Sequence, residues 1–410
     1  MRWVFVIFIC IGRWGLYASD GDLAASVGPV LYAANDSELT SQLAASNPGQ
    51  HVVLTGTVYD ENRVLYEGDV VVGADINDPP VVDAKYTFSG ADSGVYGLDF
   101  DGGWIVMEGD RAFIKRCWIH SMGAQVPIAI DDGDHVVVAN NEVYNWGNTS
   151  DCGARRGIRI RAPKPGDHDG ARWPRISWNY IRDQVNFNPE SCSPDAEVIS
   201  VGYGGSAQRG QSELGAWIHH NFLVNCGGDK EGIGVKASYN TIEFNHLNGL
   251  RGFNNRHGGF NVYRGNRIEN IDGSGKRHNR GGEQNWSIGE VTSGEFQVES
   301  GWYNFGETHG DAGTYMRSND TRIIGSVAAD FEIGVDRGNL YAINTLIEAT
   351  NKAPLLLSNQ SGTINDWDQS ASVTVPTAIT LTADDVGPLA SVSEPEPEPE
   401  PKTNRKLIAL

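Results

Sequence analysis

The 410-residue sequence predicts an all-β protein: a single-stranded right-handed parallel β-helix with an N-terminal capping helix and long loops that form a groove. The main observation is a repeated phrase, in which a polar residue or Cys is followed by one variable and one aliphatic residue. The phrase begins at Cys117, Asn141, Asn179, Asn221, Asn245, Asn266 and Asn344, with gaps of 24, 38, 42, 24, 21 and 78 residues. A short, β-rich repeat without helical periodicity is typical of a solenoid. Propeller repeats are longer and sandwich strands do not recur in phase, so both alternatives are disfavoured.

Asparagine suits the corners of such a coil. It tolerates the left-handed backbone conformation that tight corners require. Stacked Asn side chains can also form hydrogen-bonded ladders. The longer gaps leave room for inserted loops, and residues 151–175 and 202–215 have loop-like composition. Loops on one face of a solenoid often build the walls of a binding groove.

The ends of the chain differ in character from its body. Residues 1–18 combine a short basic start, an apolar run from Trp3 to Ile11 and small residues, which predicts a signal peptide and a secreted or periplasmic protein. A buried first strand is the alternative reading. We expect the β-helix over 19–375, a separate C-terminal segment over 376–393, and a Glu-Pro linker with a truncated tail over 394–410.

A helix is expected to cap the first turn, because an open solenoid end exposes strand edges and core. The segment from Asn35 to Glu38 resembles a capping box, and Leu39 and Leu43 follow at helical spacing. We expect this helix to end at Asn47-Pro-Gly and a strand to cover 51–54.

Charge and cysteine content limit the partners. The formal charge of −20 argues against nucleic acid, and no segment after the first residues is apolar enough to span a membrane. We expect a monomer. Cys117 and Cys226 lie in strand-like phrases and are expected in the core, whereas Cys152 and Cys192 lie in polar sequence and are expected to form a disulfide after export.

Candidate site residues lie where two phrases align. The segment from Glu197 to Gly202 matches the segment from Glu231 to Lys236, and a shift of twenty residues brings Arg256 level with Lys236. Residues at equal positions in successive turns lie about 4.8 Å apart. Glu197 and Glu231 would then repel each other unless something neutralises them.

Two neutralisers are open at this point. A hard cation with oxygen ligands is one, and calcium suits a flexible cluster of carboxylates. A neighbouring Arg or Lys is the other. Around this site, residues 230–280 hold nine basic and four acidic side chains. A basic patch on an acidic body indicates an anionic ligand, and the groove of a β-helix suits a long anionic polysaccharide.

Lys236 and Arg256 fit β-elimination on a polymer of uronic acids. The C5 proton of a uronate is very weakly acidic, and a cation on the carboxylate stabilises the charge that develops. A lysine acts as the base if burial or its neighbours lower its pKa, and Arg256 one turn away would favour that. Hydrolysis would instead need two carboxylates flanking the bond.

These residues resemble a known family. The run from Asp229 to Ser238, with Arg256-His257-Gly258, is similar to the signature of the chondroitinase-B-like polysaccharide lyases of family six, which are mostly alginate lyases. The resemblance implies that Lys236 is the base, that Arg256 is the acid and that His257 contacts substrate. Arg264, in the same basic segment, is also assigned to substrate binding.

The resemblance further implies a calcium ion on Asp229 and Glu231. The family usually has Glu at the first of these positions, and its third ligand, usually Asn, is unmatched here, so Asp195 or Glu197 is expected to substitute; we choose Asp195. The resemblance favours a secreted alginate lyase. A dermatan sulfate lyase is the close alternative, and a non-catalytic glycan-binding β-helix such as an adhesin is the alternative from a different class.

Overall fold

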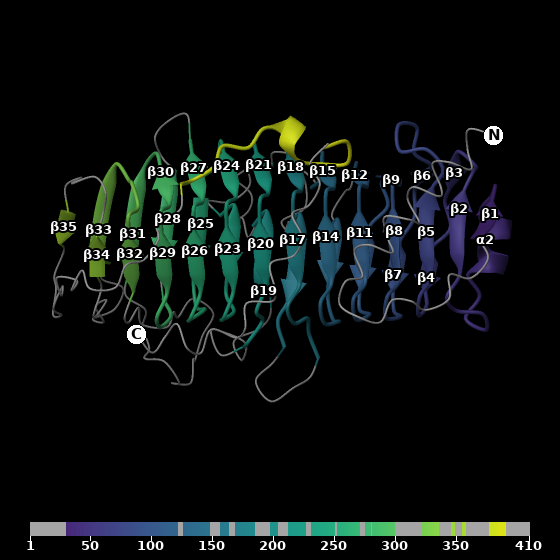
Figure 1. The fold of residues 1–410 in the computed structure, drawn as a ribbon, viewed down its shortest axis with the longest axis horizontal. Coiled ribbons are helices and arrows are strands. Elements are labelled where there is room, and N and C mark those ends of the chain that lie inside the picture. Colours follow the sequence, from purple (N-terminus) through teal and green to yellow (C-terminus); the bar gives the residue numbers. More distant parts are fainter. Residues whose placement is uncertain are drawn as a thin grey trace.

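The protein is a parallel β-helix whose coils form three long sheets (Figure 1), as the computed structural model shows. The structure describes residues 30–121, 126–147, 156–163, 169–184, 197–203, 212–226, 231–250, 252–270, 275–279, 281–299, 321–335, 346–348, 355–357 and 377–390. Every strand pair in the three sheets is parallel, and from β2 to β32 each coil contributes one strand to each sheet in turn. The predicted fold class is therefore confirmed.

The strands are short, and each sheet is ordered along the axis of the coil. The first sheet contains β1 Val30–Ala33, β2 His51–Leu54, β5 Val70–Gly73, β8 Gly94–Tyr96, β11 Phe113–Lys115, β14 Val137–Ala139, β17 Arg175–Ser177, β20 Trp217–His219, β23 Thr241–Glu243, β26 Val262–Arg264, β29 Trp286–Ile288, β32 Arg322–Ile324 and β34 Leu346–Glu348. The second sheet contains β4 Arg63–Leu65, β7 Tyr86–Phe88, β10 Ile105–Met107, β13 Ile128–Ile130, β16 Ile158–Arg161, β19 Ile199–Tyr203, β22 Ile233–Val235, β25 Gly252–Asn255, β28 Lys276–Asn279, β31 Glu295–Glu299, β33 Asp330–Val335 and β35 Leu355–Leu357. The third sheet contains β3 Val58–Tyr59, β6 Val81–Val82, β9 Asp99–Asp101, β12 Trp118–His120, β15 Glu142–Tyr144, β18 Tyr180–Arg182, β21 Phe222–Val224, β24 His246–Asn248, β27 Arg267–Glu269 and β30 Val291–Thr292.

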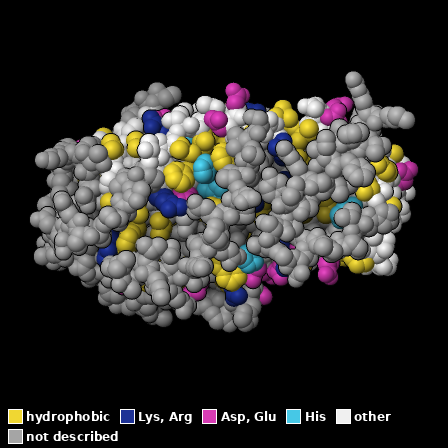
Figure 2. All heavy atoms as spheres, viewed as in Figure 1, with side chains coloured by type: hydrophobic (Ala, Val, Ile, Leu, Met, Phe, Trp, Pro, Cys, Tyr) yellow, Lys and Arg dark blue, Asp and Glu magenta, His cyan; other side chains and the backbone are white. Residues whose placement is uncertain are grey.

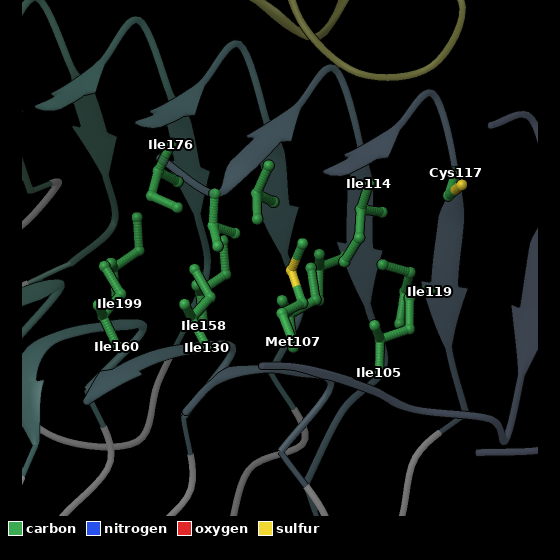
Figure 3. Close-up of a cluster of buried hydrophobic side chains, with 14 of the residues drawn as sticks. Ile105, Met107, Ile114, Cys117, Ile119, Ile130, Ile158, Ile160, Ile176 and Ile199 are labelled. Atoms are coloured by element: carbon green, nitrogen blue, oxygen red, sulfur yellow. The ribbon is translucent and has the colours of Figure 1, made fainter. Parts of the chain in front are cut away.

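Aliphatic side chains stacked from coil to coil fill the interior. Figure 3 shows part of this core, where Ile105, Ile158 and Ile199 come from β10, β16 and β19 of the second sheet and Ile114 and Ile176 from the first. All five are fully buried. Stacking from turn to turn makes this core one continuous cluster from Ala33 to Ile268, and a smaller separate cluster around Phe296 and Phe331 fills the later coils.

Asparagine ladders line the corner before the third sheet, as the repeated phrase predicts. Asn221 accepts hydrogen bonds from the backbone N–H and the side-chain amide of Asn179, at 3.0 and 2.9 Å. It passes the same pair of bonds on to Asn245. The ladder begins at the N–H of Cys117 and ends where Asn266 donates to Glu290. The polar residue of each phrase therefore satisfies the backbone at a buried corner.

The capping helix is present but shorter than expected. Helix α2, Asp36–Gln42, packs against β1, with Asn35 accepting from the N–H of Glu38 and Glu38 accepting from the N–H of Ala34. The expected end at residue 47 is wrong, because the helix stops at Gln42. The hydroxyls of Thr40 and Ser41 donate to carbonyls of the preceding turn, which competes with continuation of the helix.

The C-terminal segment crosses the outer face of the third sheet. Figure 1 shows residues 377–390 as a yellow strap that passes over β24, β21 and β18. Leu381 and Val386 pack against Trp178 and Phe222, and the N–H of Gly387 donates to the carbonyl of Trp178 at 3.0 Å. The strap therefore covers apolar surface on the outer face of the third sheet.

Cys117 and Cys226 are buried free thiols, as expected, and burial raises the pKa of each to about 12. The expected disulfide between Cys152 and Cys192 lies outside the described residues, and so does the expected signal peptide. Within the described ranges, no helix is both long and apolar enough to cross a membrane.

Candidate active site

The predicted alignment of the two acidic phrases is confirmed by the register of the second sheet. Ile199 pairs with Ile233, and Ile233 pairs with Phe253. The N–H of Val198 donates to the carbonyl of Glu231, so Glu197 and Glu231 precede neighbouring strands. The N–H of Arg256 donates to the carbonyl of Val235 at 2.8 Å, so Lys236 and Arg256 follow neighbouring strands.

Lys236 is held by a fully buried carboxylate from the preceding turn. Ile233 and Val235 point into the core, and Lys236 follows them with a side chain that is 14% exposed. Its Nζ lies 2.5 Å from Oε1 of Glu197. Arg156 approaches the other oxygen of the same carboxylate, with Nε 3.4 Å from Oε2. Two cations therefore share one buried anion.

The charges around Glu197 decide its protonation state. Burial by itself would raise the pKa of the Glu197 carboxyl, but the positive charges of Lys236, Arg256 and Arg156 lower it to about 2. An opposite charge within a few ångströms favours the ionised form of a carboxyl group. Glu197 is consequently a carboxylate at every pH at which a typical enzyme works.

Arg256 makes the corresponding pair with Glu231. Its Nε lies 2.9 Å from Oε1 of Glu231, and a second guanidinium nitrogen donates to the same oxygen. The side-chain amide of Asn254 donates to it as well. Of the two neutralisers expected for these carboxylates, the described residues show the basic side chains: Lys236 and Arg156 beside Glu197, and Arg256 beside Glu231.

Gly234 gives Glu197 the space to reach Lys236. Gly234 is the middle residue of β22 and the only one of the three whose side chain would point outward. A Cβ built there would lie 2.6 Å from both Cδ and Oε1 of Glu197. Ordinary van der Waals contact needs 3.4 Å or more. The carboxylate therefore lies across the outer surface of β22, where any other residue would block it.

The expected metal ligands are only partly within view. Glu231 is buried at the site, but Asp195 and Asp229 lie outside the described residues. Within the described ranges, no three His, Cys, Asp or Glu side chains lie close enough together to hold a metal ion. The calcium assignment stays a prediction.

His257 and Arg264, the two expected substrate contacts, lie in different places. His257 directly follows Arg256 and is 5% exposed. Arg264 ends β26 in the first sheet, where it pairs with Glu243 and lies over the ring of Phe244. The structure therefore does not bring Arg264 to the strand ends that hold Lys236 and Arg256.

The basic segment is more compensated than its composition suggested. Besides the pairs of Lys236 and Arg256, Arg264 pairs with Glu243, Arg267 with Glu269 and Arg277 with Glu290. Figure 2 shows histidine and hydrophobic side chains gathered beside basic ones over the middle of the coil, near β20 and β23.

Sequence reasoning missed two members of the site. Arg156 was one of several basic residues in a loop-like segment, and nothing in the repeat connects it to Glu197. Asn254 could have been found, because the alignment that matches Arg256 with Lys236 also matches Asn254 with the glycine of the preceding turn. An outward polar residue at that position is a signal for a contact on the outer face.

The structure was compared with known proteins. No protein-family model matches the chain, and no curated protein matches its sequence. Among solved structures, a PL6 family polysaccharide lyase from Pseudopedobacter saltans is 16% identical, with a TM-score of 0.66 over 88% of this chain and 100% of that one. A mannuronic acid specific family 6 lyase from human gut microbiota is 17% identical, with a TM-score of 0.63 over 80% and 82%.

A third neighbour, an alginate lyase solved as a complex with a ligand named G6, is 14% identical, with a TM-score of 0.60 over 86% of this chain and 88% of that one. At sequence identities this low, the comparison shows that the backbones are similar and gives no information about the active sites. Each match nevertheless covers 80% or more of this chain. The chain therefore has the β-helical fold of the family 6 polysaccharide lyases.

Proposed function

We propose that this protein is an exported polysaccharide lyase that cleaves an anionic uronate polymer, alginate, by β-elimination. The observation that supports it most is the stacking of Lys236 and Arg256 at the ends of neighbouring strands, each beside its own carboxylate. That arrangement occurs on the fold of the family 6 lyases, whose solved members include alginate lyases.

The reaction needs a base and a proton donor on adjacent carbons of one sugar. In its neutral form, Lys236 takes the C5 proton of the uronate. The C5 electron pair then forms the C4–C5 double bond while the bond from C4 to the leaving oxygen breaks. Arg256 stabilises the charge on that oxygen as it leaves and supplies its proton. No water is consumed, and the product carries an unsaturated uronate at its new end.

A calcium ion is a further part of this proposal. The local chemistry fits a hard cation in part, because Glu231 offers a buried carboxylate and Oδ1 of Asn254 is buried without a hydrogen-bond partner among the described residues. We propose Asp195, Asp229 and Glu231 as its ligands. A bound cation would supply positive charge for the substrate carboxylate.

The test is incubation of the purified protein with alginate, polymannuronate, polyguluronate and dermatan sulfate. The expected result is an ultraviolet-absorbing unsaturated product from at least one uronan. Lys236→Ala and Arg256→Ala should each lose about 10² to 10⁴ in rate and keep their circular dichroism spectra. Arg256→Lys should also fail, since an ammonium lacks the fork of a guanidinium.

Arg267→Ala is the matched control, because Arg267 makes a comparable ion pair with Glu269 on the third sheet. It should retain the activity of the unmodified protein. Binding of a uronan without any unsaturated product would favour the non-catalytic glycan-binding alternative. A product only from dermatan sulfate would move the assignment to that substrate.

A further inference from the structure

Lys236 and Arg256, the two catalytic candidates, are each held by an ion pair of the same geometry. Glu197 precedes β19 and pairs with Lys236, which follows β22 on the next turn. Glu231 precedes β22 and pairs with Arg256, which follows β25 on the next turn. Each carboxylate thus reaches diagonally across the outer face of the second sheet, from the start of one strand to the end of the next.

We propose that Glu197 is a positioning residue for the reaction, which fixes the side-chain nitrogen of Lys236 at the strand end where substrate is processed. The proposal rests on the proposed function of Lys236 as the base. It gives Glu197 a role other than that of a substitute metal ligand, and it assigns supporting roles to Arg156 behind it and Gly234 beneath it.

The first support is that Glu197 has little freedom. It is fully buried, and each of its two oxygens faces a different cation, Lys236 at 2.5 Å and Arg156 at 3.4 Å. A carboxylate restrained on both oxygens keeps one orientation. Lys236 is 14% exposed, so the charged end of a long, flexible side chain is anchored close to the surface.

The second support is the space above Gly234. A side chain at that position would overlap the carboxylate of Glu197, as the 2.6 Å approach of a Cβ shows. On the neighbouring strands, the paired outward positions carry Ser200 and Asn254. The missing side chain therefore coincides with the path between Glu197 and Lys236.

A purely structural role explains these features less well. A buried ion pair contributes little net stability compared with apolar residues of similar volume, because both charges lose their hydration. The chain has such a structural pair elsewhere: Arg277 and Glu290 are both 1% exposed, and Arg277 packs on the ring of Tyr263 in the interior. Glu197 differs because its partner Lys236 reaches the surface.

Glu197→Gln is the direct test, with Glu290→Gln as the matched control for loss of a buried carboxylate. For Glu197→Gln we expect kcat on the best uronan to fall about 100-fold while KM changes less than about threefold, since misplacement of a catalytic group by about 1 Å costs that much. Glu197→Asp keeps the negative charge but has a shorter side chain, so its kcat should lie between those of Glu197→Gln and the unmodified protein. Glu290→Gln should keep kcat within about threefold.

A second readout does not depend on activity. The rate at which an amine-reactive ester acetylates Lys236, followed by mass spectrometry, should rise at least about fivefold in Glu197→Gln, because the unpaired amine is more accessible. The rate at Lys85 should not change. If Glu197→Gln does not fold, Gly234→Ala takes its place in both measurements. This variant keeps every charged side chain and only obstructs the space through which Glu197 reaches Lys236.

The proposal is overturned if the folded Glu197→Gln protein retains kcat within about threefold of the unmodified rate, or if KM alone rises. Unchanged acetylation of Lys236 would overturn it as well. These outcomes are separable from failure of the proposed function. A wild-type protein that yields no unsaturated product from any uronan refutes lyase activity, and the acetylation rates still decide whether Glu197 positions Lys236.

Discussion

Gly234→Ala is the smallest change that should disturb the site. A methyl group at this position would lie 2.6 Å from two atoms of the Glu197 carboxylate, whereas ordinary contact begins at 3.4 Å. The carboxylate would have to move by roughly the difference, close to 1 Å. Glu197 is fully buried and engaged on both oxygens, so that movement also displaces Lys236 or Arg156.

The net effect on stability combines two opposing terms. Alanine in a strand is favoured over glycine by about 0.5–1 kcal/mol, because it restricts the unfolded chain. Overpacking a filled site costs about 1–3 kcal/mol. We therefore expect the free energy of unfolding to fall by about 1–2 kcal/mol. The rate should fall about 100-fold, since Lys236 is moved by about the distance that misaligns a catalytic group.

A double-mutant cycle with Glu197→Ala isolates the cause. If the methyl group clashes with the carboxylate, Gly234→Ala should cost much less in the Glu197→Ala background than in the unmodified protein. Urea unfolding gives both free energies. Ser200→Ala is the matched control, because Ser200 pairs with Gly234 and already carries a Cβ. Equal costs of Gly234→Ala in the two backgrounds would refute the reasoning.

Four further predictions concern other parts of the molecule. Chelation should lower lyase activity and calcium should restore it; full activity in metal-stripped protein would rule the ion out. Asn221→Ala should lower the free energy of unfolding by about 2 kcal/mol or more in urea titrations, because it leaves the buried N–H of Asn179 without its acceptor. The pKa of the Glu197 carboxyl is about 2 in the folded protein, against an ordinary value of 4.5 for glutamate. Its contribution to stability is therefore present above pH 4.5 and is lost as the pH falls toward 2, by up to about 3 kcal/mol. Acid titrations of Glu197→Gln against wild type would reveal this loss. Thiol counting on unreduced protein should find Cys152 and Cys192 oxidised, and two free thiols at these positions would reject the disulfide.

The fold could be predicted from the sequence because the repeat consists of residue types that the corners and the core of the coil require. Asn179, Asn221 and Asn245 recur at the same corner, where each satisfies the backbone of the preceding turn. Inward residues such as Ile199 and Ile233 fix the parity of their strands, since a shift by one residue would expose them. These two signals together set the register that aligns Lys236 with Arg256.

The pairing of charges could not be predicted in the same way. The register of the strands places Glu197 and Glu231 on neighbouring turns, which suggested that they repel each other. The register does not determine in which direction each side chain extends along its strand. Glu197 extends over Gly234 to Lys236, and Glu231 extends past Asn254 to Arg256. Side-chain direction depends on the space left by the next turn, which a pattern of residue types does not contain.

Arg264 shows the limit of reasoning from a run of charge. It lies eight residues after Arg256 in the sequence, and the basic segment suggested one continuous patch. The chain turns a corner after β25, however, and Arg264 emerges on the first sheet beside Glu243. Asn261, which accepts from Asn240 in a second ladder, marks that corner. A corner signal between two charges is therefore evidence that they face different sides.

The geometry of the coil explains why base and acid can be placed so simply. The C5 proton and the leaving oxygen on C4 belong to adjacent carbons, so the two groups that act on them must lie within a few ångströms of each other. Neighbouring strands are about 4.8 Å apart, and equal positions on successive turns meet this requirement by register alone. One additional turn inserted between β22 and β25 would double the separation and prevent both groups from reaching one sugar. Twenty residues separate Lys236 from Arg256, which is one turn of the coil and leaves no room for another. This spacing is as necessary to the proposed reaction as the two side chains themselves.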